Sequence, residues 1–171
     1  VNPYCSPDAK GVTHAMGHYY GLPIFGLGGV SEAKVVDQQA GAEAALTLMV
    51  ETLNGANLIH DLGYLESGLS GSLAQLAICD EVVGWLGHLI RPLTINEETL
   101  ALDLIHEQGP EGHYIETDHT MAHFRELWYP DLFERGDYGA WQADGSKSLG
   151  ERAVERVAEI LNKHDPMPLP E

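Results

Sequence analysis

Two short apolar segments joined by a long helical pattern constrain this chain more than any other feature. Residues 22–27 and 57–61 are typical of buried strands, and both lead into loops rich in glycine and polar residues. Between them, apolar residues recur at three- and four-residue steps, as on one helical face: Ala42, Ala45, Leu46, Met49, Val50 and Leu53. Gly55 stands at the position of a left-handed C-cap. A connection of this length cannot form a hairpin, so the sequence predicts two parallel strands joined by a crossover helix.

The loops after the two predicted strands hold the candidate functional residues. In parallel α/β folds the reacting groups gather at the carboxyl ends of the strands. After the first strand these positions carry Gly28, Gly29, Val30, Ser31 and Glu32. After the second they carry His60, Asp61, Tyr64 and Glu66. Acid, base and aromatic groups in one loop can hold a cation by charge and by ring face. The alternative is that His60 bonds a backbone group while Asp61 and Glu66 are solvated loop charges.

The paired glycines Gly28 and Gly29 follow a strand, as phosphate-binding glycines do. Neither the dinucleotide-binding fingerprint nor the Walker lysine pattern is present. Paired glycines permit a close backbone approach, which would open room at the strand ends. They could equally make the tight turn into the helix, and the sequence leaves both interpretations open.

The charge balance argues against some partners. The chain has 9 basic and 26 acidic residues, a net charge of -17, which repels phosphate backbones and disfavours nucleic acid. The same field attracts cations. No apolar run reaches the roughly 20 residues of a membrane span, so no membrane partner is expected. Cys5 and Cys79 are lone thiols without metal-ligand spacing, which favours a reduced, cytoplasmic compartment.

Capping residues and helix breakers predict further helices after residue 70. Their expected bounds are Ser70 or Ser72 to Arg91, Asn96 to Gly109, Asp118 to Trp128, and a last helix from the Ser148 and Glu151 capping box. Segment 131–147 is rich in glycine and predicts irregular structure held by Tyr138 and Trp141.

His119 and His123 are the candidate metal ligands. Four residues apart, they share one helical face and could both touch one ion, with His113 or Glu126 as a further ligand. In the metalloprotease motif, a glutamate directly after the first histidine acts as the general base, and that glutamate is missing here. We therefore interpret the pair as packing or hydrogen-bonding residues and assign no metal, while a metal-dependent hydrolase stays open as an alternative function.

Several segments together carry a resemblance to a known family. They are Gly-Gly-Val-Ser-Glu-Ala-Lys-Val-Val-Asp-Gln-Gln-Ala-Gly at 28–41, Gly-Ala-Asn-Leu-Ile at 55–59, Gly-Pro-Glu-Gly-His at 109–113 and His-Thr-Met-Ala-His-Phe-Arg at 119–125. In order and spacing they resemble the trimethylamine:corrinoid methyltransferase family. The similarity runs from about Tyr19 to near the C-terminus.

The resemblance implies an α/β fold that is the C-terminal part of a TIM (β/α)8 barrel, with parallel strands followed by a mostly helical C-terminal layer. Residues 1–92 would form the partial barrel, and residues 93–171 a helical region packing on it. The chain begins with Val1 and has 171 residues, well short of such a barrel enzyme, so we expect a C-terminal fragment. An incomplete barrel leaves an exposed edge strand, where we expect self-association into a homo-oligomer.

The resemblance also implies an activity in one-carbon metabolism, of the kind used in methanogenesis. Relatives pass a methyl group from a methylated amine to the cobalt of a corrinoid (cobalamin), which a separate corrinoid protein carries, so no cofactor is expected on this chain. The family's namesakes use a pyrrolysine that aligns in or beside residues 28–30, where ordinary residues stand here. A quaternary amine needs no such activation because its nitrogen leaves as a neutral tertiary amine. Glycine betaine is therefore favoured over trimethylamine.

On this interpretation Val30 and Glu66 are catalytic, and the other strand-end residues bind the substrate: Gly28, Gly29, His60, Asp61 and Tyr64. The isolated chain is expected to lack methyl-transfer activity, because an incomplete barrel leaves the pocket open. A non-catalytic fragment that only docks a partner such as the corrinoid protein is the other alternative.

Overall fold

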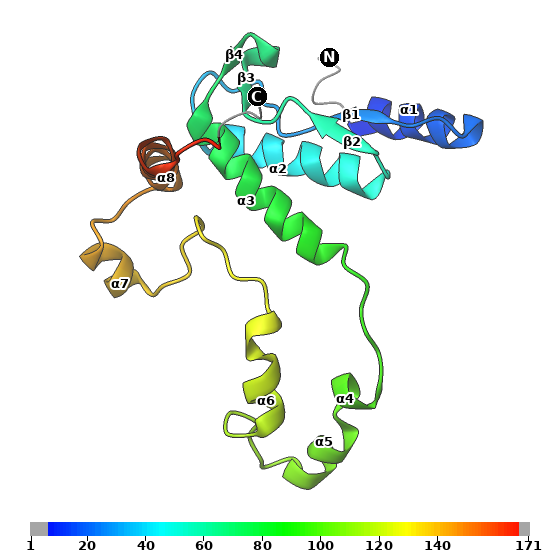
Figure 1. Cartoon of the computed structure of the whole chain (residues 1–171), viewed down its shortest axis with the longest axis vertical. Helices are drawn as coiled ribbons and strands as arrows, with labels where there is room; N and C mark the ends of the chain where they lie inside the picture. Colours follow the sequence, from blue (N-terminus) through cyan, green and yellow to red (C-terminus); the bar gives the residue numbers. More distant parts are fainter. Residues whose placement is uncertain (1–6, 168–171) are drawn as a thin grey trace. The chain divides into compact units, whose positions relative to one another are not determined.

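The structure, a computed structural model, describes the backbone of residues 7–167 and the side chains of residues 9–167 (Figure 1). Its elements in chain order are α1 (Pro7–Tyr20), β1 (Phe25–Leu27), α2 (Gln38–Leu53), β2 (Leu58–His60), β3 (Tyr64–Leu65), the 3-10 turn η2 (Glu66–Gly68), β4 (Ser70–Gly71), α3 (Leu73–Leu89), α4 (Glu97–Leu100), α5 (Leu102–Gln108), α6 (Asp118–His123), the 3-10 turn η3 (Phe124–Glu126), α7 (Tyr138–Ala143) and α8 (Leu149–Lys163).

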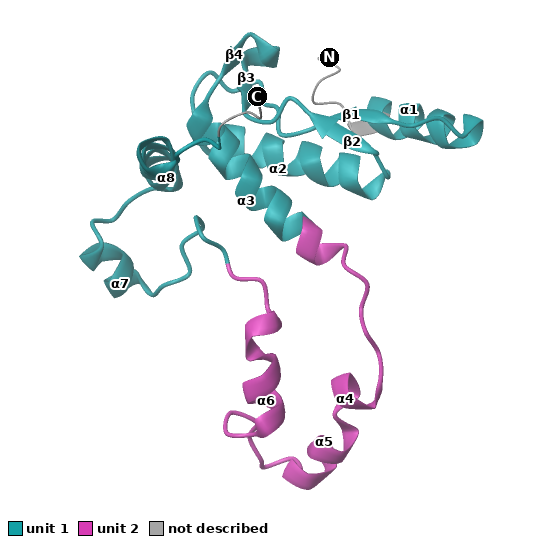
Figure 2. Cartoon of the chain, in the orientation of Figure 1, with its two compact units in different colours: residues 1–86, 130–171 teal, residues 87–129 magenta. Residues whose placement is uncertain are grey.

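The chain forms two compact units, which Figure 2 colours separately. The larger contains residues 1–86 and 130–171, and the smaller contains residues 87–129. The predicted division into a partial barrel (residues 1–92) and a helical region packing on it (residues 93–171) stays a prediction. The candidate residues that follow the two strands all belong to the larger unit, and His119 and His123 belong to the smaller one.

The predicted parallel strand pair is present. β1 and β2 pair in parallel, from Phe25 opposite Leu58 to Leu27 opposite His60, and α2 is the crossover helix between them (Figure 1). Each strand has 3 residues and is shorter than the predicted segment. The fold is therefore α/β with a parallel strand pair, although the strands of the described residues form two separate two-stranded sheets and not a closed barrel.

The ends of α2 follow from local capping. The Asp37 carboxylate accepts a hydrogen bond from the Ala40 N–H at 3.0 Å and so satisfies one of the free amides of the first turn. At the other end Gly55 has a φ of +75°, a left-handed conformation that glycine adopts without steric cost. The predicted C-cap is confirmed.

The face of α2 that the structure buries is not the predicted one. The buried residues are Ala40, Ala44, Thr47, Leu48 and Glu51. Leu46 and Leu53, on the predicted apolar face, are 46% and 66% exposed. Thr47 and Glu51 can lie inside because both have polar partners, the Gly29 N–H for Thr47 and Lys10 for Glu51. The spacing of apolar residues in a sequence does not reveal which polar side chains will find such partners, so it could not predict this buried face.

Glycines allow α2 to approach β1 closely. A Cβ at Gly26 would overlap the Glu51 carboxylate, and a Cβ at Gly28 would lie 2.7 Å from Cγ2 of Ile59 and 3.0 Å from Cδ2 of Leu48. Side chains alternate along a strand, so Phe25 lies on the opposite face of the sheet. That face is open in the described residues, and Phe25 is 63% exposed.

A buried ionic contact joins α1 to α2. The Lys10 Nζ lies 2.8 Å from Oε1 of Glu51, and Nε2 of His14 lies 2.8 Å from Oε2 of the same carboxylate. Lys10 also donates to the carbonyl of Leu27. All three side chains of the ionic contact are buried, so they must satisfy one another in place of water.

α3 and α8 complete the core of the larger unit. Ser72 caps α3 by accepting the Gln75 N–H at 3.3 Å, which selects Ser72 over Ser70. The predicted capping box of Ser148 and Glu151 starts α8. The cores of this unit are formed by Ala44, Leu48, Cys79 and Val82, by Ala74, Ile78, Leu132 and Ala153, and by Ala33, Ala40 and Leu65.

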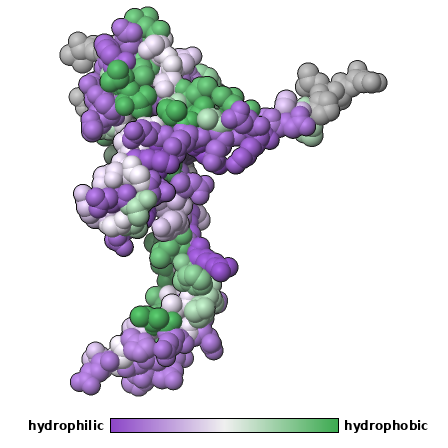
Figure 3. All heavy atoms as spheres, turned by 90° about the vertical axis from the view of Figure 1, so that its left-hand side faces the viewer, coloured by the Kyte–Doolittle hydropathy of each residue, from purple (hydrophilic) through white to green (hydrophobic). Residues whose placement is uncertain are grey.

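Other large apolar residues remain on the surface. Figure 3 shows hydrophobic residues exposed among hydrophilic ones on the face it draws. Leu69 is 81% exposed and Leu73 is 56% exposed, both in the larger unit. Single exposed apolar residues are common on protein surfaces, and these carry no functional assignment.

Several boundaries differ from the prediction. The antiparallel hairpin of β3 and β4 was not predicted, because its strands have 2 residues each. In residues 87–129, the helix predicted from Asn96 to Gly109 is divided at Ala101, which has a φ of +48°. The helix predicted from Asp118 to Trp128 is capped by Thr117 and leaves α-helical geometry after His123. The segment predicted to be irregular contains α7.

We expect Glu51→Ala to destabilise the protein by about 3–5 kcal/mol, because it leaves Lys10 and His14 buried without their carboxylate. The measurement is the urea unfolding midpoint followed by tryptophan fluorescence. Glu159→Ala is the matched control, since Glu159 forms an exposed ion pair with Arg156 at 3.6 Å. Equal midpoints for the two variants would contradict a stabilising role for the buried contact.

Candidate functional site

Two loops meet at the carboxyl ends of β1 and β2. We call residues 28–33 and 61–68 the strand-end loops. Backbone hydrogen bonds of 3.0–3.1 Å join them: Ser31 N–H to Tyr64 O, Glu66 N–H to Ala33 O, and Gly63 N–H to Gly29 O. The predicted site residues therefore lie in one region of the larger unit, as the parallel strand pair requires.

The first strand-end loop is buried and its amides are mostly engaged. The Gly28 N–H donates to the His60 carbonyl and the Gly29 N–H donates to Oγ1 of Thr47, both at 3.1 Å. From residue 28 to 33, the amide of Val30 is the exception, with no hydrogen-bond partner in the described part of the chain. Val30 itself is 1% exposed. Its N–H is therefore a buried amide of this loop that is unpaired among the described residues.

Gly29 is required by both backbone conformation and space. Its φ is +75°, and a Cβ there would lie 3.0 Å from the Cα of Leu62 and 3.1 Å from Sγ of Cys79. Together with the close packing at Gly28, this favours the structural interpretation of the glycine pair. The assignment of Gly28 and Gly29 to substrate binding stays a prediction.

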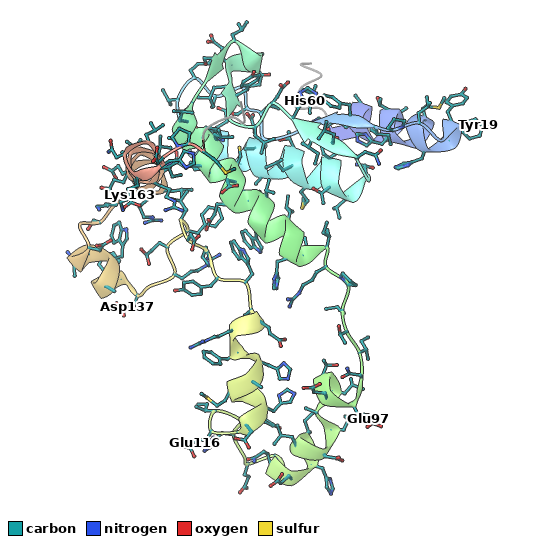
Figure 4. The ribbon with its side chains drawn as sticks, in the orientation of Figure 1. Tyr19, His60, Glu97, Glu116, Asp137 and Lys163 are labelled. Carbon is teal, nitrogen blue, oxygen red and sulfur yellow. The ribbon has the colours of Figure 1, made fainter. Side chains whose placement is uncertain are left out.

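His60 and Asp61 form a pair at the end of β2. The Nδ1 of His60 lies 2.8 Å from Oδ1 of Asp61, and both side chains are partly buried. The His60 ring lies on the open face of the sheet, with its centroid 4.3 Å from that of Phe25, and Figure 4 labels His60 beside the strand pair. The Asp61 carboxylate therefore orients the His60 ring.

Tyr64 and Glu66 lie on the hairpin that follows. Tyr64 is 41% exposed, so part of its ring is accessible. The Glu66 carboxylate makes no ion pair or hydrogen bond with the residues that the structure describes. An accessible ring and a free carboxylate in one hairpin can attract a cation by the ring face and by charge.

The second strand-end loop contains a cluster of unusual backbone conformations. Asp61, Glu66 and Ser67 have φ values of +70°, +52° and +59°, in the left-handed region that favours glycine. Each such residue costs about 1–3 kcal/mol and persists only where its surroundings hold it. Such conformations cluster at functional sites, which supports a site in this loop.

Glu43 on α2 is a residue of the site that sequence reasoning missed. Oε2 of its carboxylate accepts hydrogen bonds from Ser31 Oγ at 2.7 Å and from the Glu32 N–H at 2.8 Å. Desolvation by burial raises the pKa of this carboxyl, but hydrogen bonds from Ser31, Glu32 and Gln39 outweigh it and hold the pKa below its ordinary value. Glu43 is therefore stabilised as an anion beside the first strand-end loop.

Cys79 packs beneath the same loop. Its Sγ lies 3.4 Å from the Gly29 carbonyl, and desolvation by burial raises the pKa of the thiol to about 11. A buried thiol with a raised pKa is a packing group and not a nucleophile. Cys5 lies outside the described residues.

His119 and His123 lie in the smaller unit, where their rings stack with centroids 4.4 Å apart. The His119 Nε2 donates to the Glu98 carbonyl at 2.8 Å, and Nδ1 of His123 lies 2.7 Å from Oε1 of Glu126. Within residues 7–167 the structure brings together no group of three or more metal-ligating side chains. The observed contacts match the packing and hydrogen-bonding interpretation of the pair.

Comparison with known proteins finds a matching family and several relatives that are named methyltransferases. The family model for trimethylamine methyltransferase (MTTB) matches residues 7–171. The trimethylamine methyltransferase MttB of Desulfitobacterium hafniense is 36% identical over 156 residues, covering 91% of this chain and 32% of the relative. Its counterpart in Methanosarcina thermophila is 33% identical over 170 residues, covering 98% of this chain and 35% of the relative.

A further relative is named for a different substrate. The glycine betaine methyltransferase of Desulfitobacterium hafniense is 34% identical over 153 residues, covering 88% of this chain and 32% of the relative. The chain belongs to the trimethylamine methyltransferase family. It spans about a third of the length of these relatives.

Among the described helices, none combines the length and the hydropathy that a membrane-spanning segment requires.

We expect the contribution of Glu43 to stability to depend on pH. Because its folded-state pKa is depressed, this contribution is complete above the ordinary value of 4.5 and is lost as the pH falls through the lower folded-state value. Glu43→Gln should therefore lower the urea midpoint near neutral pH, and the difference from wild type should shrink in acid. Gln38→Ala, on the exposed side of the same helix, should keep the wild-type pH profile. A difference that stays constant down to about pH 3 would contradict the assignment.

Proposed function

We propose that the protein containing this chain transfers a methyl group from a methylated amine to a corrinoid protein. Family membership supports this proposal, since relatives are named trimethylamine and glycine betaine methyltransferases. The observation that carries it is that a Glu66 carboxylate unpaired among the described residues and an accessible Tyr64 ring occur in one hairpin, at the carboxyl ends of two parallel strands. That is where α/β enzymes bind their substrates.

The proposal includes the fold of the longer protein. The chain would supply the last strands of a TIM barrel, and the open face of β1 and β2, with Phe25 and His60, would face the barrel interior. In the described residues the outer edges of this strand pair are unpaired. The isolated chain would therefore self-associate through an edge, and it would lack activity because its pocket has no other wall.

The favoured substrate is a quaternary amine such as glycine betaine. Ordinary residues occupy positions 28–30, where the resemblance places the family's activating pyrrolysine. A quaternary nitrogen needs no such activation, because it keeps the electron pair of the breaking C–N bond and leaves as a neutral tertiary amine. The corrinoid of the partner supplies the nucleophile that accepts the methyl group.

The chain's own residues would then bind and orient the substrate. Tyr64 and Glu66 would hold the cationic nitrogen by ring face and by charge, assisted by Asp61. A substrate carboxylate needs donors, which His60 and the free N–H of Val30 can provide. Fixed groups that place the methyl carbon in line with its acceptor lower the barrier by orientation. On this proposal Val30 and Glu66 are the catalytic residues.

The substrate assignment is tested with the full reading frame that contains this chain. With cob(I)alamin as the acceptor, we expect demethylation of glycine betaine and none of trimethylamine, because a quaternary nitrogen is permanently cationic and leaves as a neutral tertiary amine without an activating residue. The change in the cobalamin absorption spectrum follows the reaction. Turnover of trimethylamine alone would defeat the assignment, and binding of the corrinoid protein without turnover of either amine would favour a docking role.

The cation-binding residues are tested in the same protein. We expect Glu66→Gln to raise KM for the quaternary amine about 10-fold, equivalent to about 1.4 kcal/mol, because it removes the negative charge. Tyr64→Leu should act similarly by removing the ring, whereas Tyr64→Phe should retain most of the affinity. The control is Glu159→Gln, a charge change on the exposed α8 ion pair. Unchanged kinetics in Glu66→Gln and Tyr64→Leu would place the cation elsewhere.

A further inference from the structure

Glu43 makes the contacts expected of a residue that fixes a loop. It lies on α2 and is not part of either strand-end loop, yet Oε2 accepts from Ser31 Oγ at 2.7 Å and from the Glu32 N–H at 2.8 Å. Oε1 accepts from Nε2 of Gln39 at 3.1 Å. Hydrogen bonds to an ionised carboxylate are roughly twice as strong as neutral ones. Glu43 therefore ties the first strand-end loop to the helix.

Ser31 links the Glu43 carboxylate to the backbone of the first strand-end loop. Its hydroxyl donates to Glu43 and accepts the Ala33 N–H at 2.9 Å, so both contacts set the orientation of one buried group. The backbone N–H of Ser31 donates to the Tyr64 carbonyl at 3.0 Å. The segment from Ser31 to Ala33 is thus held from α2 on one side and contacts the second loop on the other.

The second strand-end loop depends on that segment. The Glu66 N–H donates to the Ala33 carbonyl at 3.1 Å, and the Ser67 N–H donates to the Ser31 carbonyl at 3.4 Å. Ser67 Oγ donates to Oε2 of Glu32 at 2.6 Å. Glu66 and Ser67 are two residues with left-handed φ values, a conformation that persists only when surrounding contacts impose it. Residues 31–33 supply such contacts to both residues, beside the turn hydrogen bond from the Leu69 N–H to the Glu66 carbonyl.

We propose that Glu43 is a positioning residue of the strand-end site, whose carboxylate orients residues 31–33 so that they hold Glu66 and Ser67 in their left-handed conformation. It acts through Ser31 and Glu32 and not on the substrate. The consequence for catalysis rests on the proposed function. The structural role rests on the hydrogen bonds alone, so the two can be tested separately.

Glu43→Ala and Glu43→Gln distinguish positioning from a general loss of charge. Alanine leaves the Ser31 hydroxyl and the Glu32 N–H without their acceptor. Glutamine can place its amide oxygen where Oε2 lies, so both donors keep a partner and only the charge is lost. We expect a large effect for alanine and partial rescue by glutamine, with Gln38→Ala on the exposed side of α2 as the matched control.

The structural test is amide hydrogen exchange, measured on the full reading frame. Glu43→Ala should speed exchange of the amides of residues 31–33 and of Glu66 and Ser67 about 10-fold or more, with a smaller effect for Glu43→Gln and none for Gln38→Ala. Exchange in α8 should stay unchanged, which shows that the variant is folded. If Glu43→Ala is folded and leaves exchange in both loops within about twofold of wild type, the proposal is overturned. Ser31→Ala, which should reproduce the alanine result, decides the matter if Glu43→Ala does not fold.

The catalytic test uses the methylated amine that the wild-type protein demethylates. Glu43→Ala should lower kcat/KM about 10-fold or more, and Glu43→Gln should recover most of that loss. Loosened loops with unchanged kcat/KM would overturn the positioning role. If the wild-type protein demethylates no amine, the proposed function fails, and the exchange experiment still decides whether Glu43 holds the loops.

Discussion

The parallel pairing of β1 with β2 is the constraint on which the rest of the described structure depends. It requires a crossover, and α2 provides it by lying against the sheet face where Gly26 and Gly28 leave room. Because the strands run the same way, both strand-end loops emerge at one edge. For this reason the backbones of Tyr64 and Glu66 come within hydrogen-bonding distance of the first loop.

A polar stripe on α2 organises β1 and the loop after it. Glu43, Thr47 and Glu51 recur at four-residue spacing and so share one helical face. Glu51 contacts Lys10 and His14, Thr47 accepts the Gly29 N–H, and Glu43 accepts from the first strand-end loop. One face of α2 thus makes the buried ionic contacts with α1 through Glu51 and the contacts with the first strand-end loop through Thr47 and Glu43. The helix is a scaffold for the site as well as a crossover.

Prediction from the sequence succeeded where local rules decide the outcome. The crossover, the Gly55 C-cap and the Ser148 and Glu151 capping box follow from spacing and from backbone preferences of a few adjacent residues. Prediction failed for the buried face of α2, where apolar Leu46 lies outside and polar Glu51 lies inside. Burial of Glu51 depends on α1, whose partner residues are about forty positions earlier in the chain.

The same distinction applies to the site. The sequence by itself determined the family, the order of strand, helix and strand, and which residues follow each strand, because these depend on neighbours along the chain. Only the tertiary structure decided that Val30 has a free amide, that Glu43 binds the loop, and that Glu66 and Ser67 adopt left-handed backbone angles. These features arise from hydrogen bonds between segments distant in sequence, which composition, period and spacing do not encode.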